Sequence, residues 1–228
     1  MSEQLLLDLG PPLIPTFANF LPGQNAQAVS VLQQIKTDLQ SKGLTLAQPP
    51  FVTLWGPAGT GKTHLLKALG GWALSPSGDH ELFKGAIHAP LVTADDVQTY
   101  SDWQQQELFK LYNYARQQGG PIIVASVNQA VMQLILREDL RSRLLWGLTF
   151  GLSPLSDEEV IDALSQHVRA RGLSLSPEVV LYVLHRFTRD MGTLMQVVDC
   201  IDRYAMQHKR TITVALVREM ISARSRLS

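Results

Sequence analysis

The sequence of 228 residues has a single cysteine and lacks any long apolar run. One cysteine excludes an intrachain disulfide and a cysteine-rich metal site. Because Cys200 stands in an apolar helical pattern, we interpret it as a buried structural thiol. No stretch approaches the roughly 18 apolar residues of a membrane helix, and no basic start precedes the first leucines as in a secretory signal. These absences predict a cytoplasmic protein with no membrane partner.

An excess of charge of either sign is also missing. The chain has 20 Lys and Arg residues against 20 Asp and Glu residues, so its formal net charge is zero. Without a global basic field, binding to nucleic acid through bulk charge is not expected. The length suffices for one α/β domain followed by a smaller second domain.

Short apolar runs alternate with helical patterns in the first two thirds of the chain. The apolar runs predict strands over 51–55, 90–94 and 121–125. The spacing of apolar residues predicts helices over 25–42, 61–74 and 101–118. This alternation is typical of βαβ units and predicts a parallel sheet.

Two local features of this region carry further predictions. Asn25 stands at the start of the first helix and is expected to cap it. Residues 75–90 contain Ser-Pro-Ser-Gly and are interpreted as a loop that carries a short strand over Gly85–His88.

The two ends of the chain differ from this alternating pattern. Prolines at 11, 12 and 15 and the lack of a helical period predict a flexible arm over residues 1–15. From about Leu155 onward only helical signals occur. They are a capping box over Ser156–Glu159, an N-cap with proline at Ser176-Pro177, a helical run over 190–208 and a cap at Thr213. We therefore predict an α/β domain over 16–153 and a helical domain over 154–228.

The strongest chemical signal is the stretch GPAGTGKT, which fits the phosphate-loop pattern G-x-x-x-x-G-K-[ST] in full. Its residues are Gly56, Pro57, Ala58, Gly59, Thr60, Gly61, Lys62 and Thr63. Glycines let consecutive N–H groups point at an anion, and the helix that follows adds its dipole. Lys62 is expected to reach the β- and γ-phosphates of a nucleotide, and the Thr63 hydroxyl to bind Mg²⁺. A plain glycine-rich turn is the structural alternative.

A second motif, which is acidic, is expected at the end of a neighbouring strand. The stretch LVTADD places Asp95 at the strand end and Asp96 beside it. Asp95 is expected to hold Mg²⁺ through water. Asp96 stands where many hydrolases keep a glutamate that orients the attacking water, but its side chain is shorter. A pair of turn or capping aspartates is the alternative.

Four segments together resemble the AAA+ module of the DnaA family of bacterial replication initiators. They are GPAGTGKT, ADDVQ at 94–98, IIVASVNQ at 122–129 and DLRSRLLWGL at 139–148, followed by the helical C-terminal part. The resemblance covers nearly the whole chain. It implies a P-loop AAA+ domain with a parallel sheet and helices, followed by a small all-helical lid domain. The stretch TFANFLPGQNAQAV at 16–29 resembles the segment that such proteins place beside the adenine.

The resemblance also implies roles for single residues. Asn128 matches the sensor position that holds a polar group near the γ-phosphate, with a turn asparagine as the alternative. Arg143 matches the arginine finger, which reaches the γ-phosphate bound by a neighbouring subunit, and Arg141 is a second candidate in the same segment. Gly192 falls where the lid normally carries a nucleotide-contacting arginine. Arg189 is nearly one turn earlier, so its side chain is expected to point about 60° away.

The arm contains the stretch QLLLDL, which resembles the short peptide that replication proteins insert into the polymerase sliding clamp, the β subunit. Its candidate contact residues are Gln4, Leu5, Leu7 and Leu9. A disordered peptide can dock as a strand-like ligand in such a cleft. An arm folded back on its own domain is the alternative.

Together these features resemble the regulatory inactivators of DnaA, which have the ATPase module without the DNA-reading domain. The resemblance implies a negative regulator of initiation that binds ADP or ATP with Mg²⁺ and contacts DNA indirectly through the clamp. It would promote hydrolysis of ATP held by DnaA, with weak or no ATPase activity of its own. Two alternatives remain: a helicase-loader-like ATPase that binds single-stranded DNA, and an adaptor that brings another partner to the clamp. A homodimer or higher homo-oligomer is also left open.

Overall fold

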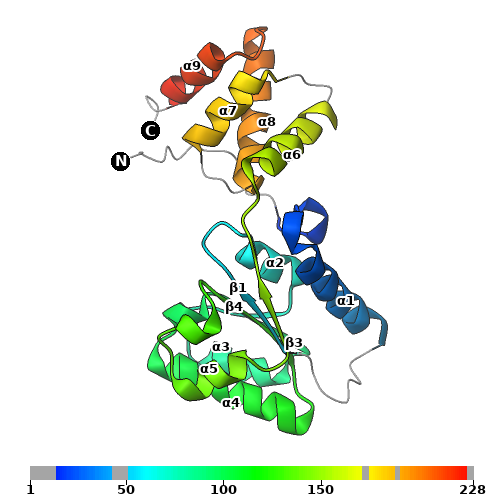
Figure 1. Cartoon of the computed structure of the whole chain (residues 1–228), viewed down its shortest axis with the longest axis vertical. Coiled ribbons are helices and arrows are strands. Elements are labelled where there is room, and N and C mark those ends of the chain that lie inside the picture. Colours follow the sequence, from blue (N-terminus) through cyan, green and yellow to red (C-terminus); the bar gives the residue numbers. More distant parts are fainter. Residues whose placement is uncertain (1–13, 43–50, 171–174, 188–190, 225–228) are drawn as a thin grey trace. The chain divides into compact units, whose positions relative to one another are not determined.

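The computed structural model describes residues 14–42, 51–170, 175–187 and 191–224. Contacts divide the chain into two compact units, one spanning Pro15–Pro154 and the other including Leu155–Ser228. Each unit has its own hydrophobic core. The units are drawn in sequence colours in Figure 1, and each is described by itself below.

The first unit contains one sheet of five parallel strands. These are β1 (Phe51–Trp55), β2 (Trp72–Leu74), β3 (Leu91–Ala94), β4 (Ile122–Val127) and β5 (Leu148–Gly151). Their order in the sheet is β2-β3-β4-β1-β5, and each neighbouring pair is parallel. The predicted fold class, a parallel α/β sheet followed by a helical domain, is confirmed.

Helices cover both faces of this sheet (Figure 1). The helices are α1 (Ala26–Lys42), α2 (Lys62–Leu69), α3 (His80–Gly85), α4 (Asp102–Gln118) and α5 (Glu138–Leu144). Short 3-10 turns stand at Phe17–Asn19, Gly23–Asn25, Ala86–His88, Val97–Thr99 and Val131–Gln133.

Strand β4 shows why two separate cores form. Successive side chains of a strand point to opposite faces of the sheet. Ile122 and Val124 therefore pack with residues of α1 and α2, whereas Ile123 and Ala125 pack with residues of α3, α4 and α5. All six residues of β4 are buried, which explains why the strand is a continuous apolar run apart from Ser126.

Three sequence predictions in this unit are wrong. The helix predicted over 61–74 ends at Leu69, because Gly70 and Gly71 adopt φ of 83° and 92°. Glycine accepts this left-handed region without steric cost. The residues that follow form β2, with Trp72 opposite Val92 of β3.

The second error concerns Gly85–His88, which is helical rather than a strand. The side chain of Asp79 accepts a hydrogen bond from the Leu82 N–H at 2.9 Å and so caps α3. Residues 85–88 continue this turn as the end of α3 and a 3-10 turn. The preceding Ser-Pro-Ser-Gly is typical of a loop, so the sequence gives no clear signal for the start of this helix.

The third error concerns Asn25, which does not act as the predicted N-cap. It ends a 3-10 turn that runs into α1, and its side-chain amide pairs with the backbone of Ser153. Its Nδ2 donates to the Ser153 carbonyl and its Oδ1 accepts from the Ser153 N–H, both at 2.9 Å. This pair joins the first helix to the chain that leaves β5.

The second unit is helical throughout the part that the structure describes. Its helices are α6 (Asp157–Ala170), α7 (Pro177–Arg186), α8 (Met191–His208) and α9 (Val214–Arg224). The predicted capping box is confirmed: Ser156 N–H donates to Glu159 at 2.7 Å, and Glu159 N–H donates to Ser156 at 3.2 Å. The Thr213 hydroxyl accepts from the Leu216 N–H at 3.3 Å, as expected of a cap.

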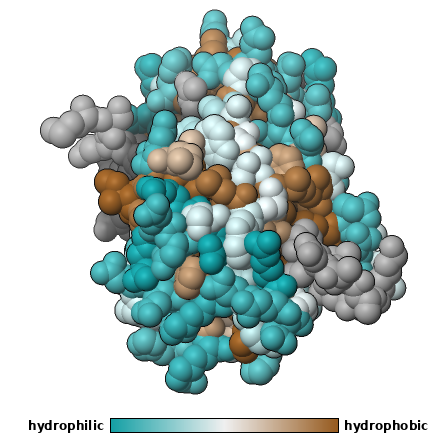
Figure 2. Space-filling model, turned by 60° about the horizontal axis from the view of Figure 1, so that its bottom comes forward, coloured by the Kyte–Doolittle hydropathy of each residue, from teal (hydrophilic) through white to brown (hydrophobic). Residues whose placement is uncertain are grey.

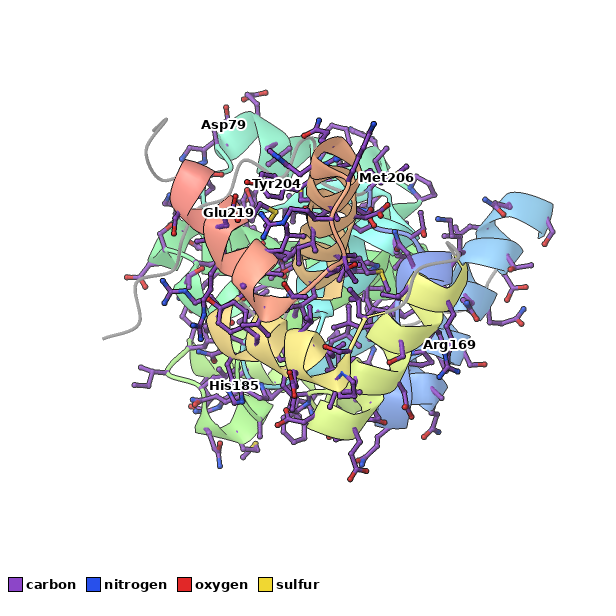
Figure 3. The ribbon with its side chains drawn as sticks, turned by 90° about the horizontal axis from the view of Figure 1, so that it is seen from above. Asp79, Arg169, His185, Tyr204, Met206 and Glu219 are labelled. Carbon is purple, nitrogen blue, oxygen red and sulfur yellow. The ribbon has the colours of Figure 1, made fainter. Side chains whose placement is uncertain are left out.

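The core of this unit includes Cys200, which is 1% exposed, as predicted. Figure 3 shows Tyr204 of α8 near Glu219 of α9, where the tyrosine hydroxyl donates to the carboxylate at 3.5 Å. Among the described residues, no helix has the length and apolar character needed to cross a membrane.

Candidate nucleotide site

The phosphate loop connects β1 to α2 in the first unit. Its start is fixed because the Gly56 N–H donates to the Val127 carbonyl of β4 at 3.3 Å. Gly59 and Gly61 adopt φ of 82° and 86°, which lets the loop curl toward the N-terminus of α2. A Cβ at Gly59 would meet no atom within 4 Å, so one side of the loop is open. A Cβ at Gly56 would come within 2.5 Å of the Leu152 carbonyl oxygen, so that position is closed to side chains.

Lys62 lies inside this curl as the first residue of α2. Its side chain is buried, with 7% of the residue exposed, and its Nζ donates to the carbonyls of Gly56 at 2.7 Å and Pro57 at 2.9 Å. Burial lowers the pKa of Lys62, while the nearby charges of Asp96 and Asp95 act in the opposite direction. The loop therefore holds a partly desolvated cation, which is the group that a phosphate would stabilise.

The acid pair follows β3 at the same end of the sheet. Asp95 Oδ1 accepts a hydrogen bond of 2.5 Å from the Ser126 hydroxyl, and the Asp96 N–H donates to that hydroxyl at 3.0 Å. Asp96 has φ of 50°, in the left-handed region that aspartate enters more readily than most residues. Ser126, 0% exposed, thus fixes both acids against β4.

Sequence reasoning missed two members of this polar group, Ser126 and Gln98. Gln98 Nε2 donates to Asp96 Oδ1 at 3.1 Å, and Gln98 Oε1 accepts from the Asn128 N–H at 3.1 Å. A signal for Ser126 was present in the sequence, since it is the one hydroxyl in the apolar run IIVASV. Gln98 offered no comparable signal, because one of its two partners, Asn128, lies 30 positions away.

Residues 16–20 lie against the phosphate loop. A reciprocal pair of hydrogen bonds between Thr16 and Asn19 holds their 3-10 turn. The His64 Nε2–H donates to the Thr16 carbonyl at 2.9 Å, and the rings of Phe20 and His64 are 5.4 Å apart. A Cβ at Gly61 would overlap the Phe20 ring, so glycine is needed there for the close approach.

These groups fit a nucleotide with Mg²⁺. The loop has an open glycine and a buried cation, and Thr63 is exposed at the start of α2. The two carboxylates that influence Lys62 supply oxygen ligands of the kind that Mg²⁺ prefers, usually completed by water and phosphate. Asn128 is exposed directly after β4.

Arg143 is held within a separate cluster made by α4, α5 and the turn after α5. Its Nε donates to Asn113 Oδ1 at 3.1 Å, and its Nη1 donates to the Ser142 hydroxyl at 3.0 Å. Its guanidinium carbon lies 4.9 Å from the centroid of the Phe109 ring and 4.3 Å from that of Trp146. Arg143 is half-buried in this cluster, so its orientation is set by the fold.

The other predicted site residues divide between described and undescribed parts of the chain. Gln4, Leu5, Leu7, Leu9 and Arg189 lie outside the described residues. Gly192 is the second residue of α8, and Arg141 is half-buried on α5.

The comparisons with known proteins concern the lid and the fold of the chain. Residues 157–221 match a family model described as the lid domain of Hda. The helical unit of this chain is therefore similar to the lid domain of Hda. The lid match covers the described helices from α6 into α9.

The solved structures that resemble this chain share its fold. Domain III of DnaA from Thermotoga maritima has a TM-score of 0.67 and 18% identity, and the match covers 94% of this chain and 98% of that one. AMPPCP-bound DnaA from Aquifex aeolicus has a TM-score of 0.64 and 21% identity, covering 87% and 68%. The Holliday-junction motor RuvB from Thermotoga maritima has a TM-score of 0.63 and 14% identity, covering 95% and 73%.

Proposed function

We propose that this chain is a negative regulator of replication initiation that promotes hydrolysis of the ATP held by DnaA. The match of residues 157–221 with the Hda lid carries this proposal. Hydrolysis would leave DnaA with ADP, the form in which it does not initiate. Arg143 would act in trans, on nucleotide bound by the partner.

The chain would hold its own adenine nucleotide at the phosphate loop. The N–H groups of 56–63 and the Lys62 ammonium would bind the phosphates, with Asn128 near the terminal one. The Thr63 hydroxyl and, through water, Asp95 would hold Mg²⁺, which neutralises phosphate charge when bound. The solved DnaA with AMPPCP supports an adenine nucleotide, and we propose ADP or ATP as the ligand.

Arg143 suits the role of a finger on chemical grounds. A guanidinium is always charged and forks onto two phosphate oxygens at once. Its present partners, Asn113, Ser142 and two aromatic rings, leave it half-buried and pre-oriented. Met132 and Ile135, which are 69% and 98% exposed, precede α5 in the chain and would add apolar contact area for DnaA.

The N-terminal arm would bring this activity to replicated DNA. Gln4, Leu5, Leu7 and Leu9 would insert into the sliding clamp, so contact with DNA would be indirect. Hydrophilic side chains dominate the face shown in Figure 2, and apolar ones gather in separate patches. The zero net charge favours an indirect contact over binding through a broad basic field.

The deciding experiment measures phosphate release from DnaA-ATP in the presence of this chain and clamp loaded on DNA. We expect release to require both. Arg143→Ala should abolish the stimulation while clamp binding persists, whereas Arg141→Ala, which tests the second candidate on the same helix, should retain it. Gln4→Ala with Leu7→Ala should remove the dependence on the clamp. If neither Arg143→Ala nor the double variant Gln4→Ala with Leu7→Ala changed the stimulation, the proposed scheme would be wrong. ATP turnover by the isolated chain in the presence of single-stranded DNA would instead support a helicase loader.

A further inference from the structure

Gln98 joins two segments that sequence reasoning treated as separate motifs. It lies in the 3-10 turn Val97–Thr99 and is half-buried. One end of its amide donates to Asp96 Oδ1 and the other accepts from the Asn128 N–H, each at 3.1 Å. A single uncharged side chain therefore connects the second acid to the main chain of the predicted sensor.

The segment around Gln98 is held in an uncommon conformation. Asp96 has φ of 50°, one of two positive values among the described non-glycine residues. Such conformations persist only where surrounding contacts fix them, and they cluster at functional sites. Here the Ser126 hydroxyl accepts from the Asp96 N–H, and the Thr99 hydroxyl donates to the Asp96 carbonyl at 2.7 Å. Gln98 adds the contact that orients the carboxylate itself.

We propose that Gln98 is a positioning residue that couples the main chain at Asn128 to the carboxylate of Asp96. The coupling would let this chain's own nucleotide site distinguish a triphosphate from a diphosphate. This inference rests on the proposed nucleotide site. A contact between Asn128 and the terminal phosphate exists only in the triphosphate state. Any shift of Asn128 in that state is passed through Gln98 to Asp96, and linkage requires the reverse effect to be equally large.

The chemistry of the amide explains why glutamine suits this place. It has one group that donates and one that accepts, at the two ends of the same plane. A glutamate would still accept from the Asn128 N–H, but it would have no donor for Asp96 and would place a second negative charge beside it. An alanine would remove both contacts.

The test compares Gln98→Glu and Gln98→Ala with the unaltered chain and with Gln106→Ala, an exposed glutamine of α4. Dissociation constants for ADP and for AMPPCP are measured with Mg²⁺ present. We expect both Gln98 variants to weaken AMPPCP binding relative to ADP by at least about fivefold, the low end of typical couplings, with Gln106→Ala unchanged. Hydrogen exchange at the Asn128 amide should quicken in Gln98→Ala but not in Gln98→Glu.

The outcomes separate the two proposals. An unaltered ratio of the two affinities in both Gln98 variants would overturn the role of Gln98 while leaving the nucleotide site intact. Equal weakening of both nucleotides would show a merely structural role and would also overturn it. Failure of the unaltered chain to bind either nucleotide would remove the proposed nucleotide site itself.

Discussion

The guanidinium carbon of Arg143 lies 4.3 Å from the centroid of the Trp146 ring. Arg116 approaches the same ring at 4.2 Å, and the ring also packs near Phe51 of β1. Trp146 therefore lies between the core of the first unit and Arg143, the predicted arginine finger.

This relationship predicts that Trp146 positions Arg143. A cation over an aromatic ring contributes about 0.5–2 kcal/mol, so Trp146→Ala should reduce stimulated DnaA ATP hydrolysis by about 2- to 30-fold. Trp146→Phe keeps an aromatic ring and should retain most of the stimulation. This variant therefore distinguishes loss of the contact with Arg143 from loss of activity by unfolding. Arg116→Ala should have little effect, because it removes the second cation over the Trp146 ring and leaves the contact between Trp146 and Arg143 in place. Full stimulation by Trp146→Ala would contradict the positioning role.

Lys62 should dominate nucleotide affinity. Truncating one partner of a buried charged contact typically costs about 2–5 kcal/mol, so Lys62→Ala should weaken ADP binding by about 30-fold or more. Lys67→Ala, on the exposed side of the same helix, is the control. Calorimetric titration with ADP measures the difference, and similar affinities for the two variants would contradict the predicted role of Lys62.

The lowered pKa of Lys62 gives this binding a pH dependence. Burial holds the pKa below the ordinary value of 10.5, so the folded chain binds fewer protons than the unfolded chain between the two values. The contribution of Lys62 to stability therefore rises with pH in that window. ADP binds the charged form, so its affinity should fall as pH rises through the lowered pKa. ADP titrations from neutral to alkaline pH would show this, and a flat profile would argue against it.

Gly147 should tolerate no side chain. It adopts φ of 77°, and a Cβ there would overlap the Phe51 carbonyl oxygen. Gly119 has a similar φ of 68° but no atom within 4 Å of a Cβ position, so Gly119→Ala measures the backbone strain alone. In urea unfolding, Gly119→Ala should lower the free energy of unfolding by about 1–2 kcal/mol. Gly147→Ala should lower it by about 1–3 kcal/mol more. Equal costs would show that the backbone at Phe51 yields freely.

The pair of Arg210 and Glu219 should weaken in acid. Arg210 lies 2.7 Å from the Glu219 carboxylate and, mainly by hydrogen bonding, holds the pKa of Glu219 below its usual 4.5. The stabilisation of the folded chain by this pair is therefore present above pH 4.5 and is lost as pH falls through the lowered pKa of Glu219. The difference in melting temperature between the unaltered chain and Glu219→Gln should be small at neutral pH and vanish in acid. In Arg210→Ala, an NMR titration should show Glu219 returning toward its usual range.

Local patterns in the sequence determined the parts of this protein that local physics controls. Strands β1, β3 and β4 are buried apolar runs, α4 has a clear apolar face, and the capping box at Ser156 forms within four residues. The phosphate loop belongs to this group too, because its pattern is contiguous.

Only the tertiary structure decided the remaining features, since their partners are distant in sequence. Strands β2 and β5 are edge strands with exposed residues, so pairing rather than apolar character defines them. Asn25 forms hydrogen bonds with Ser153, which lies 128 positions away in the sequence. Arg143 donates a hydrogen bond to Asn113, which lies 30 positions away. Gln98 reaches Asn128 over the same separation of 30. Such contacts exist only after parallel strands bring their carboxyl ends together and the helices pack on the sheet.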